Sequence, residues 1–158
     1  MHPAAIQDII EQSGGLKAPL LQILLAVQEG NPQQFISESD VNQIAESLKI
    51  SRCRVYSTAS FYTELSFKPR GIHRVRICVN APCENAGKIK ILEALQQELA
   101  ISLGQTTPDG FFSLEEVNCL GACYMSPAIK VDDTIYGDLT PEKAVSILQA
   151  IRKESKLP

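Results

Sequence analysis

The first seventy residues carry apolar side chains at three- and four-residue steps, the spacing of helices with one buried face. A first helix should begin at Pro3 and end before Ser13, and a second should cover about Leu16–Glu29. A third should open after Ser37 and a fourth after Ser51, since serine accepts hydrogen bonds from first-turn amides. Helices this short are marginal alone in water, so the four should pack together as a bundle.

A boundary follows at Phe67–Gly71, where Pro69 and Gly71 stand on either side of Arg70. Proline keeps its predecessor out of the helical region and glycine frees the next turn, so the fourth helix must end before this segment. The sequence therefore predicts two domains, an N-terminal helical bundle over residues 1–70 and a second domain over residues 71–158.

Beyond this boundary the apolar positions alternate along Val75–Val79, as on a strand that delivers Cys78 at its end. Helical spacing returns over Lys88–Leu103, and a second strand is expected over Phe111–Cys119. A strand, a helix and a second strand in this order form a crossover that lays the two strands parallel. Both strands would then deliver a cysteine to the same edge of the sheet.

Two short strands and a last helix complete the pattern. The strands are expected over Ala128–Val131 and Thr134–Tyr136, joined across Asp132-Asp133. Thr140 should cap the final helix, which has Pro141 at its first position. Together these segments predict an α+β chain, with an N-terminal four-helix bundle followed by an α/β domain.

Four of the five cysteines form two close pairs. Cys78 and Cys83 enclose four residues, Cys119 and Cys123 enclose three, and thirty-five residues separate the pairs. A two-iron cluster suits this arrangement, because each iron takes two thiolates and the bridging sulfides complete its coordination. We predict a [2Fe-2S] centre that has all four thiolates as its metal ligands.

Other chemistries of these thiols compete with this interpretation. A structural zinc also takes four thiolates, although its pairs are usually closer and joined by a shorter segment. Disulfides belong to secreted domains, and dithiol redox chemistry normally uses C-x-x-C, which the sequence lacks. A Rieske centre needs histidine ligands, yet His2 and His73 both lie outside the cysteine loops. Zinc is the alternative that stays open.

The composition is that of an ordinary globular protein of 158 residues, with 44% hydrophobic and 21% charged side chains. The longest apolar run, Ala18–Val27, is too short to span a bilayer, which takes roughly 20 residues. No secretory signal follows Met1, and an odd number of cysteines indicates a reducing compartment. We therefore expect a cytoplasmic protein without direct membrane insertion.

The third and fourth predicted helices raise a separate hypothesis of DNA binding, because Ile44–Tyr56 has the pattern of a helix-turn-helix. Between Glu38 and Tyr62, however, three acidic side chains cancel three basic ones, whereas a groove-reading helix usually needs a net basic footprint. The formal net charge of −3 gives no electrostatic case for nucleic acid either. Cys53, in this segment, is expected to be partly buried in the bundle and not a fifth ligand.

The sequence offers no evident catalytic group. The acid pairs Glu115-Glu116 and Asp132-Asp133 have no nucleophile or base beside them, which favours a strand edge and a solvated turn. The nucleotide-binding patterns G-x-G-x-x-G and G-x-x-x-x-G-K-[ST] are absent. A catalytic site must then lie on a partner.

Several segments together resemble one known family. They are the two cysteine pairs, Glu116–Cys123, Ser126–Ala128, Tyr136–Glu142, and upstream Phe61-Tyr62 with Lys68–Gly71. These segments are similar to those of the thioredoxin-like [2Fe-2S] subunit of the peripheral arm of respiratory complex I. The same module serves NAD(P)-linked hydrogenases, formate dehydrogenases and electron-bifurcating complexes. The resemblance covers nearly the whole chain and implies a thioredoxin-like [2Fe-2S] ferredoxin fold for the second domain.

The resemblance implies an electron-transfer role. In that family the cysteines that match Cys78, Cys83, Cys119 and Cys123 bind one [2Fe-2S] cluster, and the subunit docks on a flavoprotein that carries FMN and binds NAD(P). We therefore expect a subunit of an NAD(P)H-linked oxidoreductase complex, non-catalytic alone, that exchanges single electrons with the flavin.

Further iron-sulfur subunits are also expected as partners, and nucleic acid is not. The complex should lie in the cytoplasm or form the cytoplasmic arm of a membrane-associated assembly. A redox-sensing DNA-binding regulator and a zinc-stabilised interaction module remain the alternatives.

Two loop features bear on the surroundings of the cluster. Gly121 and Ala122 should keep the second cysteine loop small, so that backbone amides can approach the sulfurs. The first loop, Val79–Pro82, departs from the small and hydroxylated residues expected of the family. Hydrogen bonding to the sulfurs, and with it the reduction potential, is the property that this loop should affect most.

Overall fold

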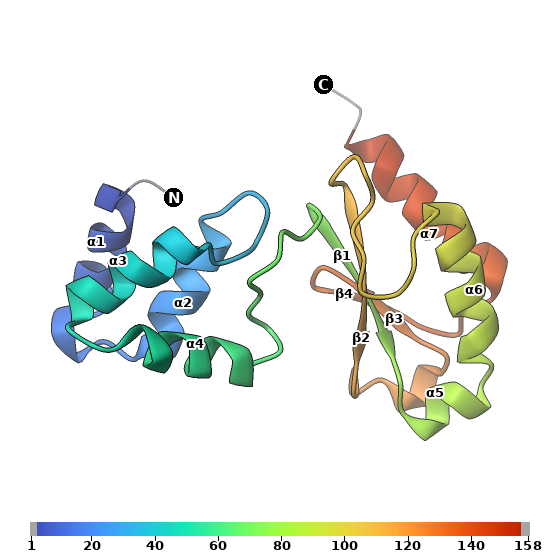
Figure 1. The fold of residues 1–158 in the computed structure, drawn as a ribbon. Helices are drawn as coiled ribbons and strands as arrows, with labels where there is room; N and C mark the ends of the chain where they lie inside the picture. The colour runs from blue at the N-terminus through green and yellow to red at the C-terminus, as the bar shows by residue number, and fades with distance from the viewer. Residues whose placement is uncertain (1–2, 156–158) are drawn as a thin grey trace. The chain divides into compact units, whose positions relative to one another are not determined.

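The computed structural model describes residues 3–155 (Figure 1). Internal contacts divide the chain into two compact units, residues 1–70 and 71–158. Each unit has its own hydrophobic core. The described part of the first unit is helical, and the second unit is a mixed α/β domain.

In the first unit, four α-helices and one 3₁₀ turn follow one another along the described residues. They are α1 (Pro3–Gln12), η1 (Gly15–Lys17), α2 (Leu20–Glu29), α3 (Glu38–Leu48) and α4 (Arg52–Phe61). Apolar stripes at helical spacing meet in one core, because none of these short helices could bury its apolar face alone. The core contains Ile6, Ile10, Ile23, Leu24, Val27, Ile36, Val41, Ile44, Val55 and Leu65.

Serine caps set the starts of α3 and α4. Ser37 Oγ accepts a hydrogen bond from the amide of Asp40 at 3.2 Å, and the Asp40 carboxylate accepts one from the amide of Ser37 at 2.9 Å. This reciprocal pair is a capping box. Ser51 Oγ accepts from the amide of Arg54 in the same way. Each serine thus supplies an acceptor to a first-turn amide that has no partner within the helix.

The second helix is shorter than the apolar pattern predicted. Leu16 lies in η1, and α2 begins only at Leu20, after Pro19. Ala18 is extended, with φ −61° and ψ 138°, because the residue before a proline is kept out of the helical region. The apolar spacing continues across this break, so periodicity alone could not show it.

The second unit is built on a four-stranded sheet. Its strands are β1 (His73–Cys78), β2 (Phe112–Val117), β3 (Ile129–Val131) and β4 (Thr134–Tyr136), in the order β2-β1-β3-β4. β1 and β2 are parallel, whereas β1 with β3 and β3 with β4 are antiparallel. The predicted strand-helix-strand crossover is therefore present.

Helices cover one face of this sheet. After β1 come the short helix α5 (Ala81–Asn85) and the crossover helix α6 (Lys88–Leu99); η2 (Cys123–Met125) and α7 (Pro141–Glu154) complete the unit. Figure 1 shows α6 and α7 side by side on the same face of the sheet. Ile91 and Leu95 of α6 and Leu148 of α7 form one core with alternate residues of three strands: Val75, Ile77, Phe112, Leu114, Ile129 and Val131.

Two predicted elements end earlier than expected. α6 stops at Leu99 and not at Leu103, because Ala100 adopts the left-handed conformation (φ 53°) that ends many helices. β2 stops at Val117, so Cys119 lies in the loop beyond the strand and not on the strand itself.

The two acid pairs have structural roles. Asp132 accepts from the amide of Arg74 at 2.9 Å, and its other oxygen lies 2.7 Å from His73 Nδ1. Glu115 forms an ion pair with the guanidinium of Arg74 at 3.0 Å. Asp133 is exposed in the turn between β3 and β4. These contacts join the strands of the sheet.

Thr107 organises the turn that precedes β2. Its side chain is buried, and its hydroxyl accepts from the amides of Phe111 at 3.2 Å and Phe112 at 3.0 Å. The same hydroxyl donates to Asp109 Oδ1 at 2.5 Å. This bond, followed by the amide of Phe111, lowers the pKa of Asp109. One hydroxyl therefore satisfies three polar groups of the turn.

Replacing this hydroxyl should destabilise the protein. Thr107→Val keeps the shape of the side chain but leaves the buried amide of Phe112 without this acceptor. We expect a loss of about 1–3 kcal/mol in the free energy of unfolding, measured by urea denaturation. Thr134→Val, at an exposed position of β4, is the control and should change stability by less than about 0.5 kcal/mol. Equal effects of the two changes would contradict this role.

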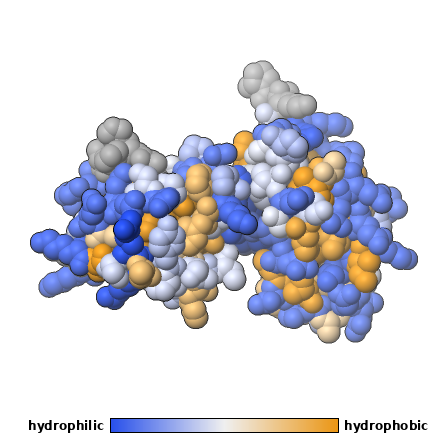
Figure 2. Space-filling view, viewed as in Figure 1, coloured by the Kyte–Doolittle hydropathy of each residue, from blue (hydrophilic) through white to orange (hydrophobic). Residues whose placement is uncertain are grey.

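The surface contains scattered apolar side chains on both units (Figure 2). The most exposed large apolar side chains that the structure describes are Phe61 at 79% and Tyr124 at 84% of their full exposure. Among the residues that the structure describes, no helix has both the length and the apolar character needed to cross a bilayer.

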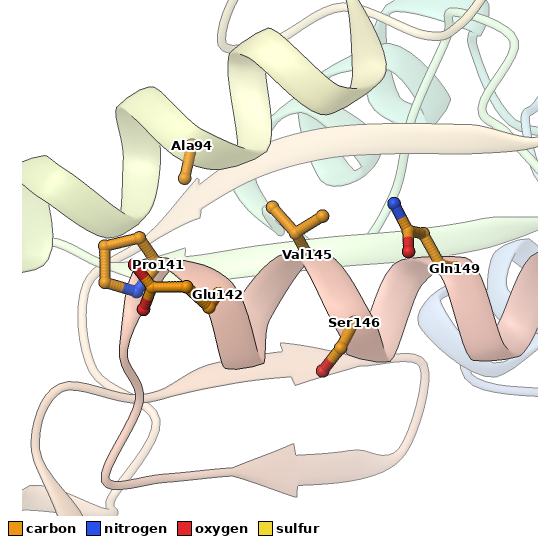
Figure 3. A pocket seen from close by; sticks show the side chains of 6 residues that line it. All are labelled: Ala94, Pro141, Glu142, Val145, Ser146 and Gln149. Atoms are coloured by element: carbon orange, nitrogen blue, oxygen red, sulfur yellow. The ribbon is translucent and has the colours of Figure 1, made fainter.

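A shallow groove of about 370 Å³ runs between α6 and α7. Figure 3 shows its lining, with Val145 of α7 pointing toward the helix that carries Ala94. The lining consists of Ala94, Pro141, Glu142, Val145, Ser146 and Gln149. It offers one carboxylate and no sulfur or imidazole, so the candidate chemistry lies in the cysteine loops instead.

Candidate functional site

The first cysteine of each pair lies where β1 and β2 end. The strands run parallel, and Cys78, the last residue of β1, pairs in register with Val117, the last residue of β2. The amide of Val79 donates to the carbonyl of Val117 at 3.0 Å, and Cys78 Sγ donates to the carbonyl of Asn118 at 3.6 Å. Cys119 follows directly. The parallel pairing therefore brings both loops to one edge of the sheet.

The second cysteine of each pair lies on a short helical turn and not in an open loop. Cys83 belongs to α5, and Cys123 begins η2. Ser126, just after η2, lies between them: its hydroxyl donates to the carbonyl of Cys123 at 2.9 Å, and its Oγ is 3.6 Å from Cys83 Sγ. The contacts of this serine link the two turns.

The site has a buried side and an exposed side. Cys78 and Cys83 are buried, at 2% and 3% exposure, whereas Cys119 and Cys123 are exposed. Two sulfurs thus lie toward the interior and two lie where another molecule can approach them.

The four sulfurs influence one another electrostatically. The pKa of Cys123 is raised, first by lost hydration of its sulfur and then by the charge of Cys119, with Cys83 and Cys78 adding to the effect. Burial is also the main cause that raises the pKa of Cys78, and the Cys83 thiol contributes to it. The other three cysteines are therefore close enough to Cys123 to affect its ionisation.

Hydrogen-bond donors gather at Cys119. The amide of Gly121 donates to Cys119 Sγ at 3.3 Å, and this bond is the main cause that lowers the pKa of Cys119. The side chain of Asn80 adds a second hydrogen bond that acts in the same direction. Donors of this kind stabilise a negatively charged sulfur.

Sequence reasoning missed two polar residues of this site, Asn80 and Ser126. Asn80 lies in the first cysteine loop, which lacks hydroxylated residues, and it supplies a donor across to Cys119. The available signal was their position: each is a polar side chain within three residues of a cysteine.

Gly121 has a different role from the one that its small size suggested. A Cβ at this position would meet nothing within 4 Å, so the loop does not need glycine for space. Its φ is +74°, in the left-handed region that residues with a side chain rarely adopt. Gly121 is therefore required by the path of the backbone, which directs its amide to Cys119. Ala122 is buried, at 5% exposure.

Cys53 stands apart from this arrangement. It lies on α4 of the first unit and is exposed, so the expectation of partial burial was wrong. The inward face of α4 is formed by Val55 and Ala59, and Cys53 is two residues before Val55, which places it on another side of the helix.

The donor set fits an iron-sulfur cluster. Within residues 3–155, no three His, Cys, Asp or Glu side chains are grouped so as to hold a metal ion. The thiols instead come as two pairs with backbone and amide donors beside them. Thiolates suit iron-sulfur clusters and zinc, and a [2Fe-2S] cluster takes two thiolates at each of its irons.

The chain matches a known family over most of its length. A model of the thioredoxin-like [2Fe-2S] ferredoxin family covers residues 6–152. One subunit of the NADH-quinone oxidoreductase of Rickettsia bellii is 32% identical over 150 residues, which are 94% of this chain and 89% of that protein. The HndA subunit of the NADP-reducing hydrogenase of Solidesulfovibrio fructosivorans is 32% identical over 105 residues, which are 66% of this chain and 61% of that protein.

A solved structure shares the fold. An NAD⁺-reducing [NiFe]-hydrogenase in the air-oxidized state superposes with a TM-score of 0.70 at 18% identity, over 85% of this chain. The chain spans 24% of that hydrogenase chain. At this identity the likeness shows the fold alone.

Proposed function

The chain belongs to the thioredoxin-like [2Fe-2S] ferredoxin family, and from this we propose that Cys78, Cys83, Cys119 and Cys123 bind one [2Fe-2S] cluster. The observation that carries the proposal is that the parallel pairing of β1 and β2 brings both cysteine pairs to one edge of the sheet, where Ser126 Oγ, three residues beyond Cys123, lies 3.6 Å from Cys83 Sγ. The buried thiols of Cys78 and Cys83 would hold the inner side of the cluster, and Cys119 and Cys123 the outer side.

The function that this site supports best is electron transfer within a multisubunit NAD(P)H-linked oxidoreductase. The relatives are subunits of an NADH-quinone oxidoreductase and of an NADP-reducing hydrogenase. The partner we propose is a flavoprotein that carries FMN and binds NAD(P), with further iron-sulfur subunits in a cytoplasmic complex. A bound [2Fe-2S] cluster supplies one-electron chemistry, so that electrons delivered in pairs by a hydride can pass singly.

The residues of the chain set the conditions for this transfer. Burial of Cys78 and Cys83 keeps water from the inner sulfurs. The amide of Gly121 and the side chain of Asn80 direct donors at Cys119, where they stabilise negative charge. The exposed side of the site leaves a short path for an electron to a docked partner.

We assign cluster binding to the second of the two units. We propose that residues 1–70 are a four-helix bundle domain and residues 71–158 the cluster domain, which the division of internal contacts after Arg70 supports. Because all four proposed ligands lie in the second unit, cluster binding is a property of that unit.

Electron exchange with a flavin can be tested directly. The chain is co-purified anaerobically with its flavoprotein subunit, NADH is added, and the cluster is followed by electron paramagnetic resonance. We expect the cluster to be reduced in the complex and not in the isolated chain. A flavin that is fully reduced beside a cluster that stays oxidised, although dithionite can reduce it, would overturn exchange with the flavin.

Tyr124 should contribute to docking of the partner. It follows Cys123 in η2, is 84% exposed, and an exposed aromatic side chain is a frequent anchor of protein interfaces. We expect Tyr124→Ser to weaken binding to the flavoprotein by about 2 kcal/mol, measured by titration calorimetry. Ile89→Ser, at an apolar residue of α6 that is 53% exposed, is the control. An unchanged affinity for Tyr124→Ser would contradict the role of Tyr124 as an anchor of this interface.

A further inference from the structure

Ser126 reaches toward both cysteine pairs. Its hydroxyl donates to the carbonyl of Cys123 at 2.9 Å, and its Oγ lies 3.6 Å from Cys83 Sγ. Ser126 is partly buried and Cys83 is 3% exposed, so this contact belongs to the inner side of the site. Its hydroxyl therefore places a polar group beside a sulfur that water hardly reaches.

Cluster binding changes which group can donate in this contact. A thiol at Cys83 has its own proton, and either Cys83 or Ser126 can then be the donor. A ligating sulfur is a thiolate without a proton, so the hydroxyl of Ser126 becomes the only donor of the pair. Rotation of the hydroxyl is sufficient for this exchange.

The carbonyl of Cys123 does not lose all its hydrogen bonds when the hydroxyl turns away. The backbone amide of Ser126 donates to the same oxygen at 3.4 Å. Because that bond remains, the hydroxyl can turn from a neutral carbonyl to a charged sulfur, and hydrogen bonds to charged acceptors are the stronger ones.

We propose that the hydroxyl of Ser126 donates to the Cys83 thiolate in the cluster-bearing protein and raises the reduction potential of the cluster. The inference rests on the proposed ligand set. An added electron makes the ligand sulfurs more negative, so a donor at Cys83 stabilises the reduced form more than the oxidised form. The low exposure of Cys83 strengthens the bond, because little water competes for its sulfur.

The test compares three variants in the isolated, cluster-bearing full-length chain. Ser126→Ala should weaken the affinity for the electron roughly three- to tenfold, a shift of about 30 to 60 mV to lower potential at 59 mV per tenfold. Ser126→Thr retains a hydroxyl and should keep the wild-type potential. Ser146→Ala, at an exposed serine of α7 whose hydroxyl donates to the carbonyl of Lys143 in the same helix, is the matched control.

Redox titration followed by electron paramagnetic resonance is the measurement, because it detects only molecules that hold a cluster and is insensitive to partial occupancy. An unchanged potential in Ser126→Ala, or an equal shift in Ser126→Thr, would overturn the inference. Loss of all cluster from Ser126→Ala alone would do so as well, since the serine would then act in assembly. A wild-type chain without any cluster would instead overturn the proposed ligand set.

Discussion

Cys83→Ala should abolish the cluster, whereas Cys53→Ala should leave it intact. Alanine removes a buried sulfur, and the remaining thiols of the site are already assigned as ligands. Changes beside metal ligands typically cost about 10- to 100-fold in metal affinity, so removing a ligand should cost at least as much. Iron and acid-labile sulfide, counted per chain after anaerobic purification, check the prediction.

The Cys53→Ala control matters because it also removes one thiol from the chain. Cys53 is exposed on α4, and its loss should change neither the iron content nor the visible spectrum. A full complement of iron and sulfide in Cys83→Ala would show that Cys83 is not a ligand. Loss of iron from Cys53→Ala would indicate that Cys53 of α4 takes part in binding the cluster, and would contradict a site formed where β1 and β2 end.

Gly71→Ala should destabilise the second unit by about 3 kcal/mol, because it overpacks backbone against backbone. A Cβ on Gly71 would lie 2.5 Å from the carbonyl carbon of Phe112 and 2.8 Å from the amide nitrogen of Ser113. Neither atom can rotate away, since both belong to the main chain of β2. The amide of Gly71 also donates to Ser113 Oγ at 2.5 Å, so a shift of the backbone would disturb this bond too.

The clash lies at the end of the β1–β2 pair that is opposite the cysteines, where His73 pairs with Phe112. Urea denaturation measures the loss, and iron content should stay near the wild-type value under native conditions. Gly30→Ala is the control: Gly30 ends α2 in ordinary helical geometry (φ −72°, ψ −4°), where alanine should be neutral or stabilise by up to about 1 kcal/mol. Equal stabilities of Gly71→Ala and wild type would refute the close approach.

The helices and strands of the second unit could be predicted closely from the sequence, because the patterns that indicate them involve residues that are near one another in the chain. Alternation along β1, helical spacing along α6 and the Thr140-Pro141 start of α7 each depend on neighbours in the chain. The parallel pairing of β1 and β2 then followed from their connection through a helix. The family suggested by the cysteine pattern and its flanking residues is confirmed by the match over residues 6–152.

What the sequence did not predict depends on three-dimensional contacts. The end of α6 is set by a left-handed Ala100, a conformation that alanine seldom adopts without support from the rest of the fold. The donors from Asn80 and Ser126 to cysteines of the opposite pair bridge 39 and 43 positions of the chain. No spacing rule connects residues so far apart, and the exposure of Cys53 likewise depended on how α4 is turned.

The central claim is that this chain holds a two-iron cluster on its own four thiolates. Its most direct test is electron paramagnetic resonance of the anaerobically purified, reduced chain, with iron, sulfide and zinc counted in the same sample. The account predicts two irons and two sulfides per chain and the signal of a half-reduced iron pair. A colourless protein with one zinc, which stays colourless after reconstitution with iron and sulfide, would contradict it.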